Sequence, residues 1–265
     1  MLKSQQSVDG YVRLLVRRFF IFTTLILIFV ALYQLNRVSE DWHYIVPSEP
    51  GELLYASMFN DASDTWEQSE GRNTASISDG AIRLAVQEPD TQVYSSQAYY
   101  YDDFDLSVDA QAVEGDLDNG FGVIFRQKDR DNFYSFLISS DGFYRVTRRV
   151  DGEPRTLSNW HPSPYIAQNI GSVNRLRVIG QGEQFQFFIN DQRVDLCIPD
   201  NPEGVSTPNN FTGECTGGQW LDSLTDESIT YGRVGVTVVV DGQPIGPVVL
   251  FDNVVVLGAS PLADS

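Results

Sequence analysis

Two hydrophobic patterns divide the chain and predict an apolar helix followed by a domain of strands. Residues 19–35 form an uninterrupted run without a charged side chain, and Arg17 and Arg18 precede it. From residue 53 onward, short runs of Val, Ile, Phe, Tyr and Thr alternate with turns rich in Gly, Asp, Asn and Pro. Apolar side chains at every second position are typical of strands that bury one face.

The apolar run predicts a membrane anchor that contacts lipid through residues 19–35. As a helix it would be roughly 25 Å long, near the lower limit for crossing a bilayer. A cleavable signal peptide is the alternative, but its apolar core is usually shorter and Ala31-Leu32-Tyr33 is a poor cleavage site. A buried core helix would be amphipathic, whereas this run is apolar on all sides. The preceding arginines favour a cytoplasmic N-terminus and an extracytoplasmic C-terminal domain in the cell membrane.

The strand pattern predicts a β-sandwich with many short antiparallel strands. The predicted domain organisation is a cytoplasmic segment 1–18, a transmembrane helix 19–35, a linker 36–52, a sandwich 53–258 with an insertion at 191–231, and a tail 259–265. The predicted strands lie near 74–78, 81–87, 92–98, 104–113, 120–127, 132–138, 143–149, 173–180, 184–190, 232–240 and 248–257.

The insertion is rich in Pro, Gly, Asn and Thr and contains both cysteines of the chain, Cys197 and Cys215. In a domain outside the cytoplasm, two cysteines without another thiol favour a disulfide, which would stabilise the fold by about 3 kcal/mol. Two free buried thiols are the alternative. We also expect a short helical turn around 219–227.

Charge separates the two parts of the chain as well. Of 18 basic and 36 acidic residues, residues 1–41 hold five and three, so the remainder carries a net charge of about −20. So acidic a domain repels phosphate backbones, and we therefore expect no nucleic-acid partner.

The order of the strand motifs resembles a known family. The motifs are GAIRLAV at 80–86, NGFGVIFRQKDRDNFYSFLISSDGFYRVTR at 119–148 and VLFDNVVV at 249–256. Together they are similar to the concanavalin A-like and laminin-G-like jelly-roll domains of exported bacterial proteins, including the keto-disaccharide hydrolase-like group. The resemblance covers essentially everything after the linker. It implies an all-β, two-sheet jelly-roll sandwich with a curved face that binds glycans in many relatives.

Catalytic chemistry has little support in the sequence. Glu114-Gly115-Asp116 resembles the paired acids of laminarinase-type glycosidases, but the second glutamate of that pattern is replaced by Asn119. His161 has no nucleophile motif with which to form a triad. We therefore assign no catalytic residue and expect a noncatalytic domain rather than an enzyme.

Candidate binding residues follow from the strand alternation. The face opposite the core is predicted to present aromatic rings and polar groups suited to a glycan. The candidates are Arg126, Phe133, Arg145 and Thr147 on that face, with Tyr99, Tyr101 and Trp160 near its rim. The jelly-roll resemblance also implies a structural calcium ion, and its matching oxygen donors are Asn60, Asp61 and Asp252.

The sequence thus favours a membrane-anchored module that recognises a carbohydrate or a protein partner without transforming it. Two alternatives stay open. One is an accessory subunit of a larger membrane complex, in which the anchor would pack against other membrane proteins. The other is a glycoside-processing enzyme.

Overall fold

A computed structural model describes residues 2–40, 43–60, 65–201, 203–242 and 246–262, with side chains omitted at 2–12, 14 and 35–40. The chain forms two compact units, residues Met1–Tyr44 and Ile45–Ser265.

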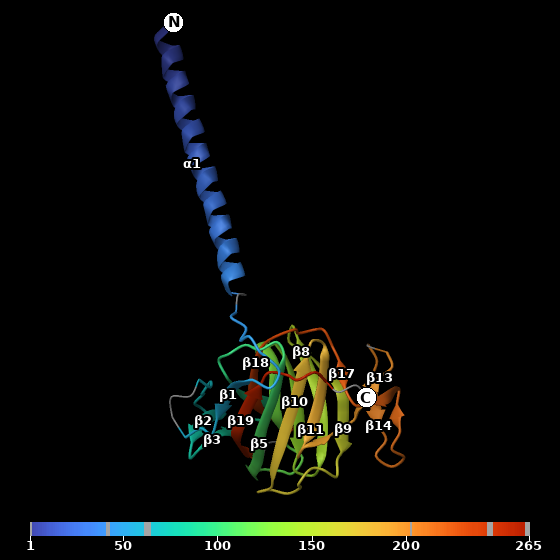
Figure 1. Ribbon diagram of the computed structural model, residues 1–265. Helices are drawn as coiled ribbons and strands as arrows, with labels where there is room; N and C mark the ends of the chain where they lie inside the picture. The colour runs from blue at the N-terminus through green and yellow to red at the C-terminus, as the bar shows by residue number, and fades with distance from the viewer. Residues whose placement is uncertain (1, 41–42, 61–64, 202, 243–245, 263–265) are drawn as a thin grey trace. The chain divides into compact units, whose positions relative to one another are not determined.

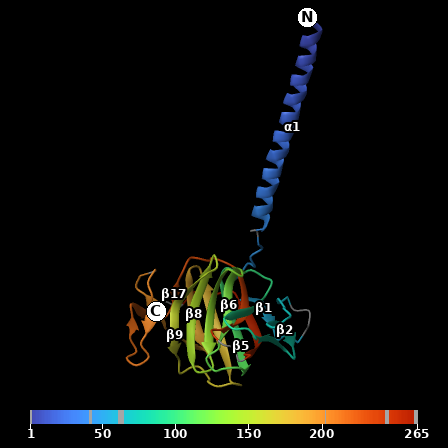
Figure 2. The same ribbon diagram turned by 180° about the vertical axis from the view of Figure 1, so that it is seen from behind.

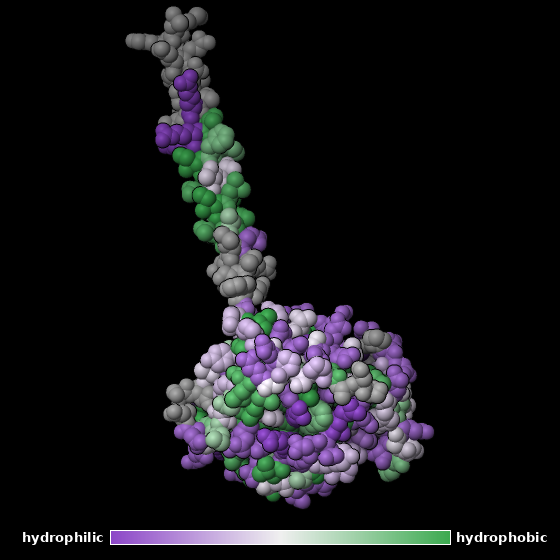
Figure 3. Space-filling model, in the orientation of Figure 1, coloured by the Kyte–Doolittle hydropathy of each residue, from purple (hydrophilic) through white to green (hydrophobic). Residues whose placement is uncertain are grey.

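The first unit is a single helix, α1 (Leu2–Glu40) (Figure 1). Its stretch Leu15–Gln34 has a mean hydropathy of 2.2 and is long and apolar enough to cross a membrane. The described side chains of this stretch are nearly all exposed and form a mostly apolar surface, green in Figure 3. The helix extends past the predicted span 19–35 on both sides and takes in the first residues of the expected linker. The reason is that its flanks contain many good helix formers and no proline before Pro47.

The second unit is a sandwich of two antiparallel sheets, as the sequence predicts (Figures 1 and 2). The nine-stranded sheet has the order β12 (Gln192–Arg193), β11 (Gln184–Ile189), β10 (Val173–Gln181), β5 (Phe104–Glu114), β19 (Val248–Leu257), β3 (Ala81–Ala85) and β2 (Thr74–Ser78). In addition, β1 (Leu53–Ser57) pairs with β19, and β17 (Leu224–Thr225) pairs with β11. The six-stranded sheet has the order β4 (Thr91–Ser96), β18 (Arg233–Val240), β6 (Gly120–Asp129), β7 (Asn132–Ser139), β8 (Phe143–Val150) and β9 (Glu153–Pro162).

Alternating side chains from the two sheets build one core. Phe121, Val123 and Phe125 of β6 face inward, as the pattern predicts, and the ring of Phe125 lies 5.3 Å from Phe185 on the opposite sheet. The centroids of Phe136 on β7 and Phe187 on β11 are 5.0 Å apart. Burying an aromatic side chain of this kind stabilises the fold by about 1.5–3 kcal/mol, so these contacts hold the sheets together.

Outside the insertion at 191–231, two strands were not predicted. The first, β1, begins two residues after Gly51, close to the predicted linker. The second, β9, contains Pro154 and Pro162. A central strand could not accommodate them, but β9 ends the six-stranded order and its edge position tolerates proline.

The insertion at 191–231 is built of short strand pairs at one end of the sandwich (Figures 1 and 2). They are β13 (Leu196–Pro199) with β16 (Gly218–Leu221), and β14 (Thr207–Pro208) with β15 (Cys215–Thr216). The predicted Cys197–Cys215 disulfide is confirmed. The predicted helical turn around 219–227 is wrong, because Trp220 pairs with Cys197 in β13–β16 and Leu224 pairs with Phe185 in β11–β17.

Candidate functional site

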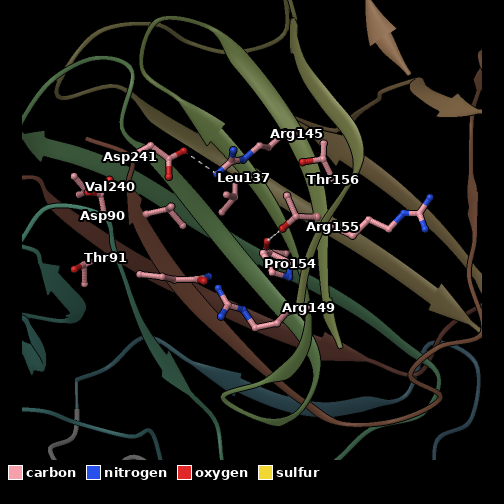
Figure 4. A pocket seen from close by; sticks show the side chains of 14 residues that line it. Asp90, Thr91, Leu137, Arg145, Arg149, Pro154, Arg155, Thr156, Val240 and Asp241 are labelled. Atoms are coloured by element: carbon pink, nitrogen blue, oxygen red, sulfur yellow. Dashed lines mark hydrogen bonds and ion pairs between the residues drawn. The ribbon is translucent and has the colours of Figure 1, made fainter. Parts of the chain in front are cut away.

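A cavity of about 390 Å³ lies on the side of the six-stranded sheet that faces away from the core (Figure 4). We call it the outer cavity. Its walls come from β7, β8 and β9, from the turn before β4 and the start of that strand, and from the end of β18. The lining side chains used below are Asp90, Gln92, Ser135, Arg145, Thr147, Arg149, Arg155 and Asp241.

Strand β8 supplies the cationic wall. Tyr144 and Val146 point into the core, so Arg145, Thr147 and Arg149 point to the other side of the sheet and line the outer cavity. One short run of alternating residues therefore places two guanidinium groups and a hydroxyl on the same surface.

Arg145 is held by an aromatic ring and a carboxylate. Its guanidinium lies 3.3 Å from Asp241 Oδ2 (Figure 4). It also lies 4.7 Å from the ring centroid of Trp160 on β9. Burial lowers the pKa of Arg145 and Asp241 offsets this. Because an arginine pKa starts above 12, the group stays charged at physiological pH.

Arg149 is held by aromatic contact alone. Its guanidinium lies 5.6 Å from the ring centroid of Phe133, its cross-strand partner on β7. Phe133 in turn lies 6.2 Å from the ring of Tyr94 on β4. Phe133 is buried on this outer surface because Arg149 and Tyr94 pack around it.

Hydroxyl and amide groups lie between the two arginines and on the opposite wall. Ser135 and Thr147 face each other across β7 and β8 and share a hydrogen bond. On the far side, Gln92 donates to Thr237 Oγ1 at 3.2 Å. The guanidinium groups of the outer cavity can therefore donate hydrogen bonds, and its hydroxyls can both donate and accept them. This combination suits a polar ligand rich in oxygen.

The expected placement of Arg126 on the outer surface is wrong. A bulge after Phe125 breaks the alternation, Arg126 takes a φ of 49°, and its side chain is fully buried. Its guanidinium donates to the carbonyls of Ile229 at 2.9 Å, Asp102 at 3.0 Å and Gly182 at 2.6 Å. Burial lowers its pKa. Arg126 thus joins three loops at one end of the sandwich.

The two tyrosine candidates also lie away from the outer cavity. Tyr101 is fully buried, its hydroxyl donates to Gln97 at 3.2 Å, and burial raises its pKa. Tyr99 is 46% exposed but does not line the cavity. Among the residues predicted from sequence, the structure therefore brings together Arg145, Thr147, Phe133 and Trp160.

Several residues of the outer cavity were not predicted. Arg149 ends the predicted strand 143–149 and continues the alternation of β8, so the pattern already placed it on this face, although it was not named as a candidate. Arg155 belongs to β9, the missed edge strand, and its guanidinium turns away from the other two arginines (Figure 4). There it contacts Glu203 at 3.5 Å and the Gly204 carbonyl at 3.3 Å. Asp90 and Asp241 carry no sequence signal, because only the pairing of β4 with β18 brings them to this site.

The calcium ligands stay a prediction. Asp61 lies outside the described residues. Asp252 lines a separate cavity of about 410 Å³ with Gly80, and Asn60 Oδ1 lies 3.4 Å from where a Cβ of Gly80 would be. Within the described part of the chain, no three His, Cys, Asp or Glu side chains are close enough together to hold a metal ion.

The residues weighed for catalysis are not arranged for it. Asp116 and Asp118 lie in the turn between β5 and β6, outside the outer cavity. His161 packs against Trp220, with ring centroids 4.5 Å apart, and burial lowers its pKa. In the outer cavity, Asp90 accepts a hydrogen bond from the Gly242 amide at 2.9 Å, and Asp241 is paired with Arg145.

Comparison with known protein families shows the family to which the chain belongs. Residues 55–216 match the 3-keto-alpha-glucoside-1,2-lyase-like domain family. The chain belongs to this family. The matched region runs from β1 to β15 and includes β7, β8 and β9, so the family domain contains most of the outer cavity but not Asp241. No curated protein matches the chain.

Solved structures confirm the jelly-roll fold. Carbohydrate-binding module CBM66 from Bacillus subtilis matches with a TM-score of 0.51 at 15% identity, covering 74% of this chain and 96% of that one. A protein with a galectin-like fold from Bacillus subtilis matches with a TM-score of 0.52 at 12% identity, covering 80% and 98%. A β-glucanase from Bacillus licheniformis matches with a TM-score of 0.51 at 11% identity, covering 80% and 100%.

Proposed function

We propose that this protein is a membrane-anchored module whose sandwich binds a carbohydrate in the outer cavity without transforming it. The observation that carries the proposal is the pairing of each of two arginines with an aromatic ring, Arg145 with Trp160 and Arg149 with Phe133, on one polar surface. The rings hold the two guanidinium groups in place, and fixed donors are what a sugar requires, because its hydroxyls need directed hydrogen bonds. The carbohydrate-binding module with the same fold supports the binding of a sugar.

The anchor is the other half of the proposal. The apolar stretch Leu15–Gln34 supports insertion in a bilayer, and Arg17 and Arg18 near its start support an N-terminus in the cytoplasm. The sandwich and its disulfide would then lie outside the cytoplasm, where cysteines are oxidised. The outer cavity would be accessible to glycans of the cell surface or the surroundings.

A glycan array probed with the full chain in detergent tests the binding. We expect Arg145→Gln and Thr147→Val to weaken the captured signal about tenfold or more, because hydrogen bonds to charged groups contribute about 1.5–3 kcal/mol. Arg175→Gln is the matched control, because Arg175 lies on β10 of the opposite sheet and pairs with Asp109 at 3.7 Å. Unchanged binding in the two cavity variants would remove the outer cavity as the site, and an array without any bound glycan would overturn the proposal.

The family gives a second candidate, cleavage of a keto-glycoside. In its favour, the outer cavity contains two carboxylates, Asp90 and Asp241, of which Asp241 is 70% exposed at its side chain. Incubating the protein with a 3-keto disaccharide and measuring released monosaccharide tests it. Release that is lost in both Asp90→Asn and Asp241→Asn would replace the binding proposal with an enzymatic one.

A further inference from the structure

Arg149 is a cation to which the described part of the chain supplies no carboxylate partner, although the protein is strongly acidic. The chain has 36 acidic and 18 basic residues. Even so, among the residues that the structure describes, no Asp or Glu lies within ion-pair distance of Arg149. Its Nε is buried and has no hydrogen-bond partner.

The neighbouring arginines differ from Arg149 in having a carboxylate partner. Arg145 pairs with Asp241, and Arg148, which points to the other side of β8, pairs with Asp226 at 2.6 Å. Arg155 turns toward Glu203 in the insertion (Figure 4). Arg149 is thus the unneutralised charge of the outer cavity. An incoming group could supply the missing anion.

The contact with Phe133 orients Arg149 for such a group. A guanidinium that stacks on a ring uses its face, so the N–H groups around its edge remain available as donors. Those edge donors match the two oxygens of a carboxylate, or two oxygens of a sulfate ester, in a bidentate arrangement. The Nε of Arg145, in the same cavity, is likewise buried without an acceptor.

We propose that the outer cavity selects an acidic sugar residue, a uronate or a sulfated sugar, whose anionic group is bound by Arg149 with Arg145 as the second donor. The inference rests on the proposed carbohydrate-binding function. The net charge of the domain does not oppose it, because exposed charges are screened beyond about 8 Å at physiological salt and the local cation decides. Two carboxylates of the outer cavity oppose it: Asp241 neutralises Arg145, and both Asp241 and Asp90 would repel an anion.

Calorimetric titration of the full chain in detergent with matched probes tests the inference. The probes are trigalacturonate, the neutral galactotriose that lacks only the carboxylates, and the same galactotriose carrying a 6-sulfate. We expect at least one acidic probe to bind about tenfold or more tighter than the neutral one, with affinity falling as salt rises. Arg149→Gln should abolish this preference, Arg149→Lys should keep part of it, and Arg175→Gln should leave it unchanged.

Asp241→Asn supplies a test that misfolding cannot imitate. Removing this carboxylate should raise the ratio of acidic-probe affinity to neutral-probe affinity several-fold, because one negative charge leaves the outer cavity. If neutral and acidic probes bind equally and Arg149→Gln weakens both alike, the acidic-sugar inference fails while carbohydrate binding stands. If no probe binds and no glycan is captured on the array, the proposed function itself fails. Tighter binding of the sulfated than of the carboxylated probe supports the inference and identifies the anion as a sulfate ester.

Discussion

Replacing Arg126 with methionine should destabilise the sandwich strongly, although the residue lies away from the outer cavity. Methionine fills much of the volume of the side chain but donates no hydrogen bond. The change removes the donor from three carbonyls: the bond to Ile229 is buried, and those to Asp102 and Gly182 are part-buried. An unsatisfied buried acceptor costs about 1–3 kcal/mol and each part-buried bond contributes about 0.5–1 kcal/mol, so the expected loss is about 3 kcal/mol.

Thermal unfolding of the full chain in detergent measures this loss. For a domain of this size, each kcal/mol lowers Tm by roughly 2–4 °C, so Tm should fall by roughly 6–12 °C. Arg175→Met is the control, because it removes an arginine whose side chain is 43% exposed and should change Tm by less than about 3 °C. An Arg126→Met protein that unfolds within 2 °C of the wild type (roughly the resolution of the assay) would refute the assignment of Arg126 as a structural tie between the three loops.

Three further outcomes follow from the described contacts. Changing Cys197 and Cys215 to alanine should cost about 3 kcal/mol, measured by urea unfolding, and a reductant should lower the Tm of the wild type but not of the double variant. Burial works against ionisation of Asp226, but the hydrogen bonds from Tyr134 and Ser228 and the charge of Arg148 together outweigh it and hold the pKa of Asp226 below its usual 3.8. The resulting stability is present above that value and is lost as pH falls through the lowered pKa, so Asp226→Asn should show a shallower loss in acid unfolding. Finally, the full chain should stay in the membrane fraction through a high-salt wash, whereas a chain lacking residues 2–44 should be released.

The sequence predicted the fold from side-chain alternation, and its errors have local physical causes. Alternation gives the face of a residue only while the strand is regular. It held for β8, where Arg145 and Thr147 point outward. It failed at Arg126, because the bulge in β6 turns that side chain inward. The residue types around Arg126 do not indicate the bulge. Gly232 leaves the space that the bulge needs, because a Cβ there would lie 2.2 Å from the Arg126 carbonyl carbon.

The outer cavity could be predicted only in part, because its walls meet through sheet pairing. The β8 residues share a short run of sequence and were accessible to pattern reading. Asp241 reaches Arg145 only because β18 lies two strands from β7 and three from β8 in the sheet, an order that no local pattern reveals. Where strands distant in sequence supply a site, side-chain alternation predicts which residues of each strand face it. It does not predict which strands lie beside one another.

The missed strand β9 is also where the insertion meets the outer cavity, and this explains the place of the disulfide. An edge strand with unpaired backbone groups invites aggregation unless it is covered. Here the Cys197 amide donates to Ser158 Oγ on β9 at 3.1 Å, and Arg155 on the same strand donates to the Gly204 carbonyl. The disulfide fixes β13 to the rest of the insertion, so it also fixes the cover of β9. Trp160, which contacts Arg145, also lies on β9. The disulfide therefore supports the wall of the outer cavity through β9, without lining the cavity itself.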